Sequence, residues 1–245
     1  MPRDPDQYDF FVSYARQDNR PAAPGTPGWI SSFVEELLAE HRKFTGGRSH
    51  KPDAPARGDR PALAGASDLC GRSLTYFFDK DEIRGLDDWQ HRIYHALAGS
   101  RLFLAFISPS YFASEWCRRE WRAWIDTEIA KHILSAGVAP IYIVEVPGLV
   151  AAAGAPRLSE QEVARQVAEL CGVPPPHAAF LDAAAPVVKQ LRRRQINAVQ
   201  PFYRAGVEWL RREDSRRVLQ ELARDLHERA ERVRHAAESE HSVTP

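Results

Sequence analysis

The chain has 245 residues, enough to bury a core in one large domain or two small ones. Lysine plus arginine and aspartate plus glutamate both total 33, so the overall charge gives no reason to expect binding to nucleic acid or to an anionic membrane. The three cysteines are far apart, which is typical of a reducing compartment and indicates neither a disulfide framework nor a zinc site. No apolar run approaches the roughly 20 residues that span a bilayer, so we expect a soluble, cytoplasmic protein.

The first predicted unit is a strand followed by a helix. Residues 8–14 (YDFFVSY) form a short aromatic and β-branched run that predicts a buried strand. Residues 28–41 carry apolar side chains at helical spacing. Residues 45–72 have five glycines, three prolines and no aromatic residue, so they cannot bury enough apolar surface to offset their ordering entropy. We therefore expect a mobile insertion there.

Strands and helices then alternate along the middle of the chain. Residues 74–78 predict a second strand, and Asp87 or Asp88 can cap the helix that follows it. Residues 102–107 (LFLAFI) are apolar without alternation, which is typical of a parallel strand covered on both faces. A tryptophan-rich helix and a strand at 138–146 come next. This alternation favours an open parallel sheet with right-handed crossovers.

The signal is weaker after Pro147. Alanine-rich and proline-punctuated stretches enclose one amphipathic helix near 159–171, so we expect 147–197 to be an irregular insertion. Residues 198–203 faintly indicate a fifth strand. The final helix is clearer, because apolar residues recur at helical spacing after Asp214, a possible cap. We place the last strand and helix at about 198–238.

The tryptophan-rich segment is the most informative part of the chain. On a helix, Trp116, Glu120 and Trp124 fall at i, i+4 and i+8 and form one stripe. A carboxylate that loses water beside aromatic rings is a candidate for chemistry. The alternative is that Glu120 reaches solvent beside two packing tryptophans. The stripe by itself leaves both interpretations open.

Several kinds of site are absent from the sequence. It has no glycine-rich phosphate loop after Tyr14, no GxSxG or HExxH motif and no cysteine pair at metal spacing. His91 and His95 form a helical i, i+4 pair, but no third ligand can be placed, so we expect no metal site. In open parallel sheets, ligands bind where the loops after the strands converge. Here these loops contain residues 13–16, 79–85 and 108–116.

Four segments together identify a family resemblance. YDFFVSYARQD, FFDKDEIRGLDDW, SRLFLAFISPSYFASEWCRREW and APIYIVEV resemble, in order and spacing, the successive motifs of Toll/interleukin-1 receptor (TIR) domains, particularly those of bacteria and plants. The resemblance implies a flavodoxin-like open parallel sheet with helices on both faces. It also implies a single TIR domain over 6–239, with a core at 6–146. The pattern departs from the family after Pro147.

The resemblance implies two functional classes. Many bacterial and plant TIR domains cleave NAD+ between nicotinamide and ribose, whereas animal adaptor TIR domains mostly act as scaffolds. The catalytic glutamate of the family lies in a WxxxE motif, which Trp116 and Glu120 match. This match favours an NAD+ hydrolase or cyclase, with NAD+ as substrate and no cofactor. A non-catalytic signalling adaptor remains the alternative. A response-regulator receiver is disfavoured, because Ser13 and Tyr14 stand where its acidic pair would be.

The resemblance and the predicted crevice together provide the candidate site. Tyr14 can stack on a flat ring and Arg16 can face a diphosphate, although a core-edge tyrosine and a solvated arginine are equally good interpretations. The candidates for binding the substrate are Tyr14, Arg16, Asp79, Ser108 and Trp116.

The segment after the second strand resembles the BB loop of the family, which closes over the site and joins neighbouring domains. Its residues are Asp81, Glu82, Ile83, Arg84, Gly85 and Leu86. The resemblance therefore implies a homo-oligomer formed by TIR–TIR contacts, with a sensor protein as a further possible partner. Such a chain would act in signalling or in antiviral defence.

Overall fold

The computed structural model describes residues 8–45, 75–78, 86–130, 137–150 and 156–241, and within them five parallel strands form one sheet. The strand order is β2-β1-β3-β4-β5. The strands are β1 (Tyr8–Ser13), β2 (Tyr76–Phe77), β3 (Ser100–Ile107), β4 (Val138–Tyr142) and β5 (Asn197–Ala198). The predicted flavodoxin-like parallel sheet is confirmed. Because β1 and β3 lie at its centre and pair from Tyr8↔Ser100 to Ser13↔Ala105, their carboxyl ends lie side by side.

Helices cover both faces of this sheet. On one face, α1 (Trp29–Phe44) and α8 (Glu213–His241) pack against the strands, and on the other lie α2 (Leu86–Ala98) and α4 (Glu115–Ala130). The alternation of side chains along β1 explains this arrangement. Phe10 packs in the apolar core under α1 and α8, and Phe11 packs in the core under α2 and α4. Gly28 is the N-cap of α1, and its missing Cβ leaves room for the carbonyl of Asn19.

The segment 147–197 is more regular than its composition predicted. Its described part contains two helices, α5 (Glu160–Leu170) and α6 (Ala178–Leu191), of which only α5 was expected. Pro186 lies inside α6, where a proline costs about 3 kcal/mol. Burying a large apolar side chain gains about 1.5–3 kcal/mol, so several of them outweigh this cost. The buried residues of α6 are Phe180, Ala184, Val187, Val188 and Leu191.

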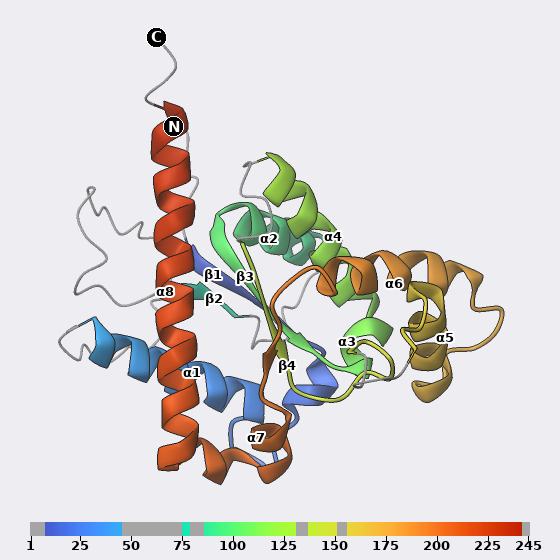
Figure 1. Ribbon diagram of the computed structural model, residues 1–245, viewed down its shortest axis with the longest axis horizontal. Coiled ribbons are helices and arrows are strands. Elements are labelled where there is room, and N and C mark those ends of the chain that lie inside the picture. Colours follow the sequence, from blue (N-terminus) through green and yellow to red (C-terminus); the bar gives the residue numbers. More distant parts are fainter. Residues whose placement is uncertain (1–7, 46–74, 79–85, 131–136, 151–155, 242–245) are drawn as a thin grey trace.

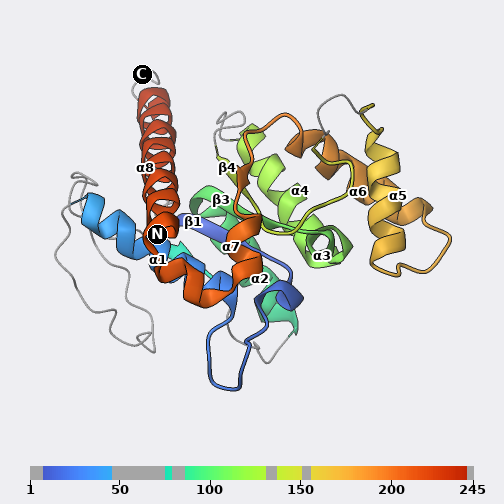
Figure 2. The same ribbon diagram turned by 60° about the horizontal axis from the view of Figure 1, so that its bottom comes forward.

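The helix α6 and the residues that follow it pack against α4. The indole of Trp121 on α4 donates a hydrogen bond to Gln190 on α6. Near the end of α4, Glu128 forms a 2.7 Å ion pair with Arg194, and both side chains are almost fully buried. Both ribbon views place α5 and α6 on the side of the sheet opposite α1 and α8 (Figures 1 and 2). The insertion thus extends the layer that contains α4.

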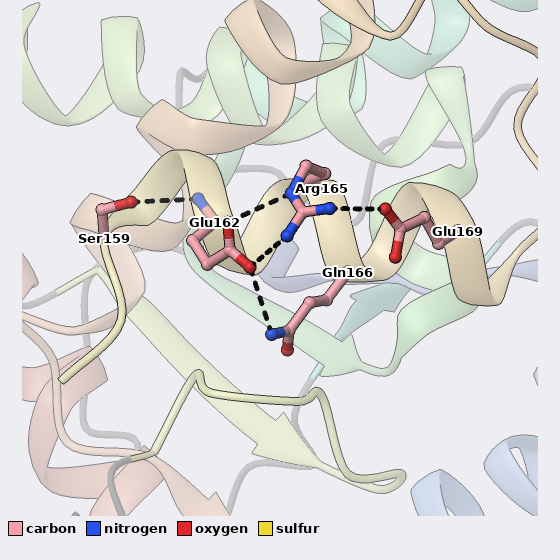
Figure 3. A network of polar contacts seen from close by, with 5 residues as sticks. All are labelled: Ser159, Glu162, Arg165, Gln166 and Glu169. Atoms are coloured by element: carbon pink, nitrogen blue, oxygen red, sulfur yellow. Dashed lines mark hydrogen bonds and ion pairs between the residues drawn. The ribbon is translucent and has the colours of Figure 1, made fainter. Parts of the chain in front are cut away.

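The exposed side of α5 carries its own polar network (Figure 3). Ser159 caps the helix by accepting a hydrogen bond from the backbone of Glu162. Arg165 binds Glu162 and Glu169 on the same side, and Gln166 donates to Glu162. Pairs at this spacing add about 0.2–0.5 kcal/mol each to an exposed helix. This network therefore adds to the stability that α5 gains by burying its apolar face.

The last strand is shorter than predicted. β5 ends at Ala198, and α7 (Gln200–Ala205) begins where the strand was expected to continue. Pro201 in the first turn favours the helix, since its missing amide proton costs nothing there. A short 3-10 helix (Val207–Arg211) then leads into α8, which starts at Glu213 and includes Asp214 in its first turn. The predicted strand at 138–146 also ends early, at Tyr142.

Two predicted segments lie largely outside the described residues. They are the insertion at 45–72 and the BB-loop residues 81–85. Within the insertion the structure describes only Thr45, which is the C-cap of α1. Leu86, the last predicted BB-loop residue, begins α2. In the described part of the chain, no helix is both long enough and apolar enough to cross a membrane.

Candidate functional site

The candidate site lies at the carboxyl edge of the sheet, beyond β1 and β3. β1 ends at Ser13, and β3 ends at Ile107 and runs through Ser108 into the short helix α3 (Pro109–Ala113). Ser108 caps α3 by accepting a hydrogen bond from the backbone amide of Tyr111. Pro109 suits the first helical position because its missing amide proton would have no partner there. The residues after two central strands thus meet at one edge, as the sequence predicted.

Glu120 reaches this edge from α4. Its Oε2 atom accepts a 2.6 Å hydrogen bond from the hydroxyl of Ser13. The Ser13 hydroxyl also lies 3.0 Å from the phenol oxygen of Tyr111. Ser13 and Tyr111 are buried, whereas Glu120 is only partly covered. The structure therefore places a partly exposed carboxylate on a buried pair of hydroxyl groups.

The three residues of the predicted stripe lie in different environments. Trp124 is fully buried and stacks on Phe103 of β3 with the ring centroids 5.4 Å apart. Trp116 is half-buried, and the guanidinium of Arg119 lies over its ring at 5.2 Å. Glu120 binds Ser13 of a neighbouring strand, which neither interpretation of the stripe included. The helical spacing was correct, but the partner of the carboxylate comes from the tertiary structure.

A second carboxylate, Asp18, lies near the same edge. Asp18 belongs to a 3-10 helix, Arg16–Asn19, that follows β1, and only 8% of the residue is exposed. Burial raises the pKa of Asp18, while hydrogen bonds from the hydroxyls of Ser108 and Ser110 oppose that shift. The Tyr203 phenol of α7 donates to the backbone oxygen of Asp18 at 3.0 Å. Asp18 thus links β1, α3 and α7 beside the site.

The other predicted site residues occupy different places at this edge. Tyr14 is half-buried and stacks on Phe78 with the centroids 4.9 Å apart, while Arg16 is exposed. The hydroxyl of Ser108 is engaged with Asp18 and with the cap of α3. Asp79 lies outside the described residues. The described structure thus places Tyr14, Arg16, Ser108, Trp116 and Glu120 on the elements next to the carboxyl ends of β1 and β3.

Sequence reasoning did not select Ser13, Asp18 or Tyr111 for the site. The signal for Ser13 is its place as the last strand residue on the face opposite Phe10 and Val12. Tyr111 lies within 108–116, a segment predicted to converge on this edge, but nothing in the sequence singled out its side chain, and Asp18 lies outside the predicted segments. Cys117 also lies near Glu120, but burial raises the pKa of its thiol, and the nearby Glu120 charge adds to that shift. A buried thiol of this kind is inert.

Other kinds of site have little support in the described part of the chain. No group of three or more histidine, cysteine, aspartate or glutamate side chains there could hold a metal ion. An open cleft of about 500 Å³ lies beside α5 and the end of α6, and none of its lining residues belongs to the carboxyl edge. Those residues are Arg157, Leu158, Glu160, Lys189, Arg192 and Arg193.

Two of three comparisons with known proteins found a match, one to a family model and one to a solved structure. A family model described as "TIR domain" matches residues 57–171, which include β2, β3, β4 and the helix that carries Glu120. The TIR domains in the structure of the activated Roq1 resistosome directly recognizing the pathogen effector XopQ match with a TM-score of 0.50. The identity is 14%, and the match covers 89% of this chain and 99% of that chain. A search of the curated proteins found no match.

Proposed function

Starting from the finding that this chain contains a Toll/interleukin-1 receptor (TIR) domain, we propose that it cleaves NAD+ at the nicotinamide–ribose bond. Glu120 is the proposed catalytic residue. The observation that carries the proposal is the position of its carboxylate, held by Ser13 at the carboxyl edge of a parallel sheet. Open parallel sheets bind their ligands at this edge. We place the activity in a signalling or defence pathway.

The chemistry requires only one carboxylate. When the bond between C1′ and the pyridinium nitrogen breaks, the electron pair stays on nitrogen, and nicotinamide leaves as a neutral base. The ribose becomes oxocarbenium-like, as in glycoside hydrolysis, and a nearby carboxylate stabilises the positive charge. Water then attacks C1′ and loses a proton, which gives ADP-ribose, or a hydroxyl of the substrate attacks and gives a cyclic product. Glu120 performs this electrostatic role in the proposal.

The remaining predicted residues have proposed binding roles. Tyr14 and Trp116 are both half-buried, so each has ring surface that can contact a flat base. Arg16 is exposed beside β1 and can pair with the diphosphate. Asp79 and Ser108 are proposed to line the same crevice. NAD+ is the substrate in this scheme, and no cofactor is required.

We also propose that self-assembly activates the protein. The support is the structural likeness to the TIR domains in the structure of the activated Roq1 resistosome. Cleavage should then rise faster than linearly with protein concentration. A TIR adaptor that acts only through protein contacts would assemble without consuming NAD+.

One experiment separates the enzyme from the adaptor. Purified wild-type protein is incubated with NAD+ over a range of protein concentrations, and the products are resolved by chromatography. We expect nicotinamide together with ADP-ribose or a cyclic form, and we expect Glu120→Gln to yield none. Glu115→Gln is a matched control, because Glu115 is an exposed carboxylate on the same helix that pairs with Arg119 one turn further along. An inactive wild-type protein at every concentration would refute the NAD+ proposal.

A further inference from the structure

We infer that Ser13 and Tyr111 are positioning residues that hold the Glu120 carboxylate through a directed chain of hydrogen bonds. The inference rests on the proposed function, because it assigns roles within the same site. The chain joins three elements that are far apart in sequence, the end of β1, the helix α3 and the helix α4. It contributes no reacting atom.

The direction of the chain follows from counting protons. The Ser13 hydroxyl has one hydrogen, and it donates this hydrogen to Oε2 of Glu120 at 2.6 Å. The 3.0 Å contact between Ser13 and Tyr111 must then use the hydrogen of the Tyr111 phenol. Tyr111 therefore donates to Ser13, and Ser13 donates to Glu120. This arrangement suits an ionised carboxylate, which only accepts hydrogen bonds.

Burial keeps the chain in this direction. Tyr111 is fully buried, and burial raises the pKa of its phenol well above the ordinary value, with smaller contributions from Cys117 and Glu120. Tyr111 thus remains protonated and remains a donor. Ser13 is 1% exposed, so water has little access to compete for its hydroxyl. Consecutive hydrogen bonds in such surroundings polarise and strengthen one another.

The surrounding structure fixes both donors. Ser13 is held by pairing with Ala105 of β3. Tyr111 lies in α3, whose start is capped by Ser108, and its ring packs edge-on against Trp121 of α4. A glutamate side chain has several rotatable bonds, and ordering them costs entropy. A preformed pair of donors orients the carboxylate before the substrate binds, which is how a positioned group favours the transition state.

The size of the effect follows from the kind of hydrogen bond. A hydrogen bond to a charged group contributes more than one between neutral groups. We expect Ser13→Ala to lower kcat about 10- to 100-fold, with little change in KM, because the proposed binding residues remain in place. Tyr111→Phe should lower kcat by a smaller factor, because Ser13 can still donate to Glu120.

The test compares the two single variants with the double variant. In a serial chain, Tyr111→Phe acts only through Ser13, so it should cause no further loss of kcat in a Ser13→Ala protein. Ser100→Ala is the matched control. Ser100 is a buried serine at the amino end of β3, away from the candidate site, and its hydroxyl donates to the backbone oxygen of Ala96. We expect the control to retain wild-type kcat. Wild-type kcat in Ser13→Ala, or independent losses that multiply in the double variant, would overturn the inference.

A structural measurement separates this inference from the proposed function. Crystal structures of the wild type, Ser13→Ala and Tyr111→Phe show the Glu120 side chain whether or not NAD+ is cleaved. We expect one carboxylate orientation in the wild type and several in Ser13→Ala. The same single orientation in Ser13→Ala would overturn the positioning role, even in an active enzyme. An inactive wild type with the expected loss of order would refute only the NAD+ proposal.

Discussion

The two ends of β1 hold nearby carboxylates in opposite ways. At the amino end, Asp9 is fully buried and accepts hydrogen bonds from the backbone and the hydroxyl of Thr75, and Arg101 lies 3.4 Å away. At the carboxyl end, serine hydroxyls hold Glu120 and Asp18. A cation neutralises a carboxylate charge, whereas a hydroxyl orients the carboxylate and leaves its charge in place.

This difference separates a structural role from a chemical one. An acid paired with arginine and tied to a neighbouring strand stabilises the sheet. An acid held by hydroxyls at the edge where substrates bind retains charge that can act on a developing cation. We therefore expect substitution of Asp9 at the amino end to change stability and substitution of Glu120 at the carboxyl end to change activity.

The largest expected effect is on turnover in Glu120→Ala. We expect NAD+ cleavage to fall by at least about 1000-fold, because the proposed carboxylate acts on the transition state. The folding free energy should change little, since Glu120 is partly exposed and its carboxylate is proposed to act on the transition state and not to hold the core. Product chromatography and thermal unfolding of the same samples measure both effects. A stable variant with near wild-type turnover would remove Glu120 from the mechanism.

Asp9→Ala should show the reverse pattern. It removes the buried carboxylate that accepts from the Thr75 backbone amide and hydroxyl and lies 3.4 Å from the Arg101 guanidinium, and breaking a buried charge pair costs about 3–5 kcal/mol. Urea unfolding should give this loss, while the protein that remains folded keeps wild-type kcat. If Asp9→Ala lowers kcat but not stability, the division between the two ends does not hold.

The amino end should also make stability depend on pH through His41. This side chain is fully buried between α1 and α8, with its Nε2 3.3 Å from Nδ1 of His227. Burial is the largest cause that lowers the pKa of His41, from 6.5 to about 4. The nearby His227 and Arg42 also lower this pKa, whereas the charge of Asp9 raises it. The unfolded chain therefore binds more protons between these pH values. Stability should be full above pH 6.5 and fall by up to about 3 kcal/mol as the pH drops to about 4.

His41→Gln tests this dependence, because glutamine does not titrate. Urea unfolding at several pH values should show a weaker loss of stability for the variant than for the wild type between pH 6.5 and 4. Parallel curves for the two proteins would show that His41 is not the source. The neighbouring His227 provides a second variant, since His227→Gln removes its repulsion and should reduce the shift only in part.

Asp18→Asn should have the smallest effect on stability, and the pH dependence that Asp18 contributes has the opposite sign to that of His41. Burial raises the pKa of Asp18 above 3.8, so the folded state binds more protons than the unfolded state just above that pH. The contribution of Asp18 to stability is therefore largest below pH 3.8 and is lost as the pH rises through its folded pKa. The variant lacks this loss, and we expect it to match or exceed wild-type stability at pH 7, by about 1 kcal/mol at most. A marked loss at pH 7 would indicate that the ionised carboxylate stabilises the fold.

Some elements were predictable because their signals are local. The aromatic and β-branched run at 8–14 identified β1, and the continuous apolar run at 102–107 identified β3, since a strand covered on both faces is rich in apolar residues. The helix α6 was missed, because a proline interrupts an alanine-rich segment whose apolar face gains its energy only by packing on α4 and α5. The strand predicted at 198–203 became a helix after two residues, since its aromatic side chains suit either structure.

The sequence by itself determined the parallel α/β class and the helix that carries Glu120, and it predicted a site at the carboxyl edge of the sheet. These features depend on the periodicity of apolar residues and on the alternation of strands and helices along the chain, and both can be read from the sequence. Only the tertiary structure decided what the carboxylate binds. Ser13 and Tyr111 are 107 and 9 residues from Glu120, and no local pattern specifies that their hydroxyls meet it. That meeting depends on how β1, α3 and α4 pack at the end of the sheet, because hydrogen bonds require positions accurate to a fraction of an ångström.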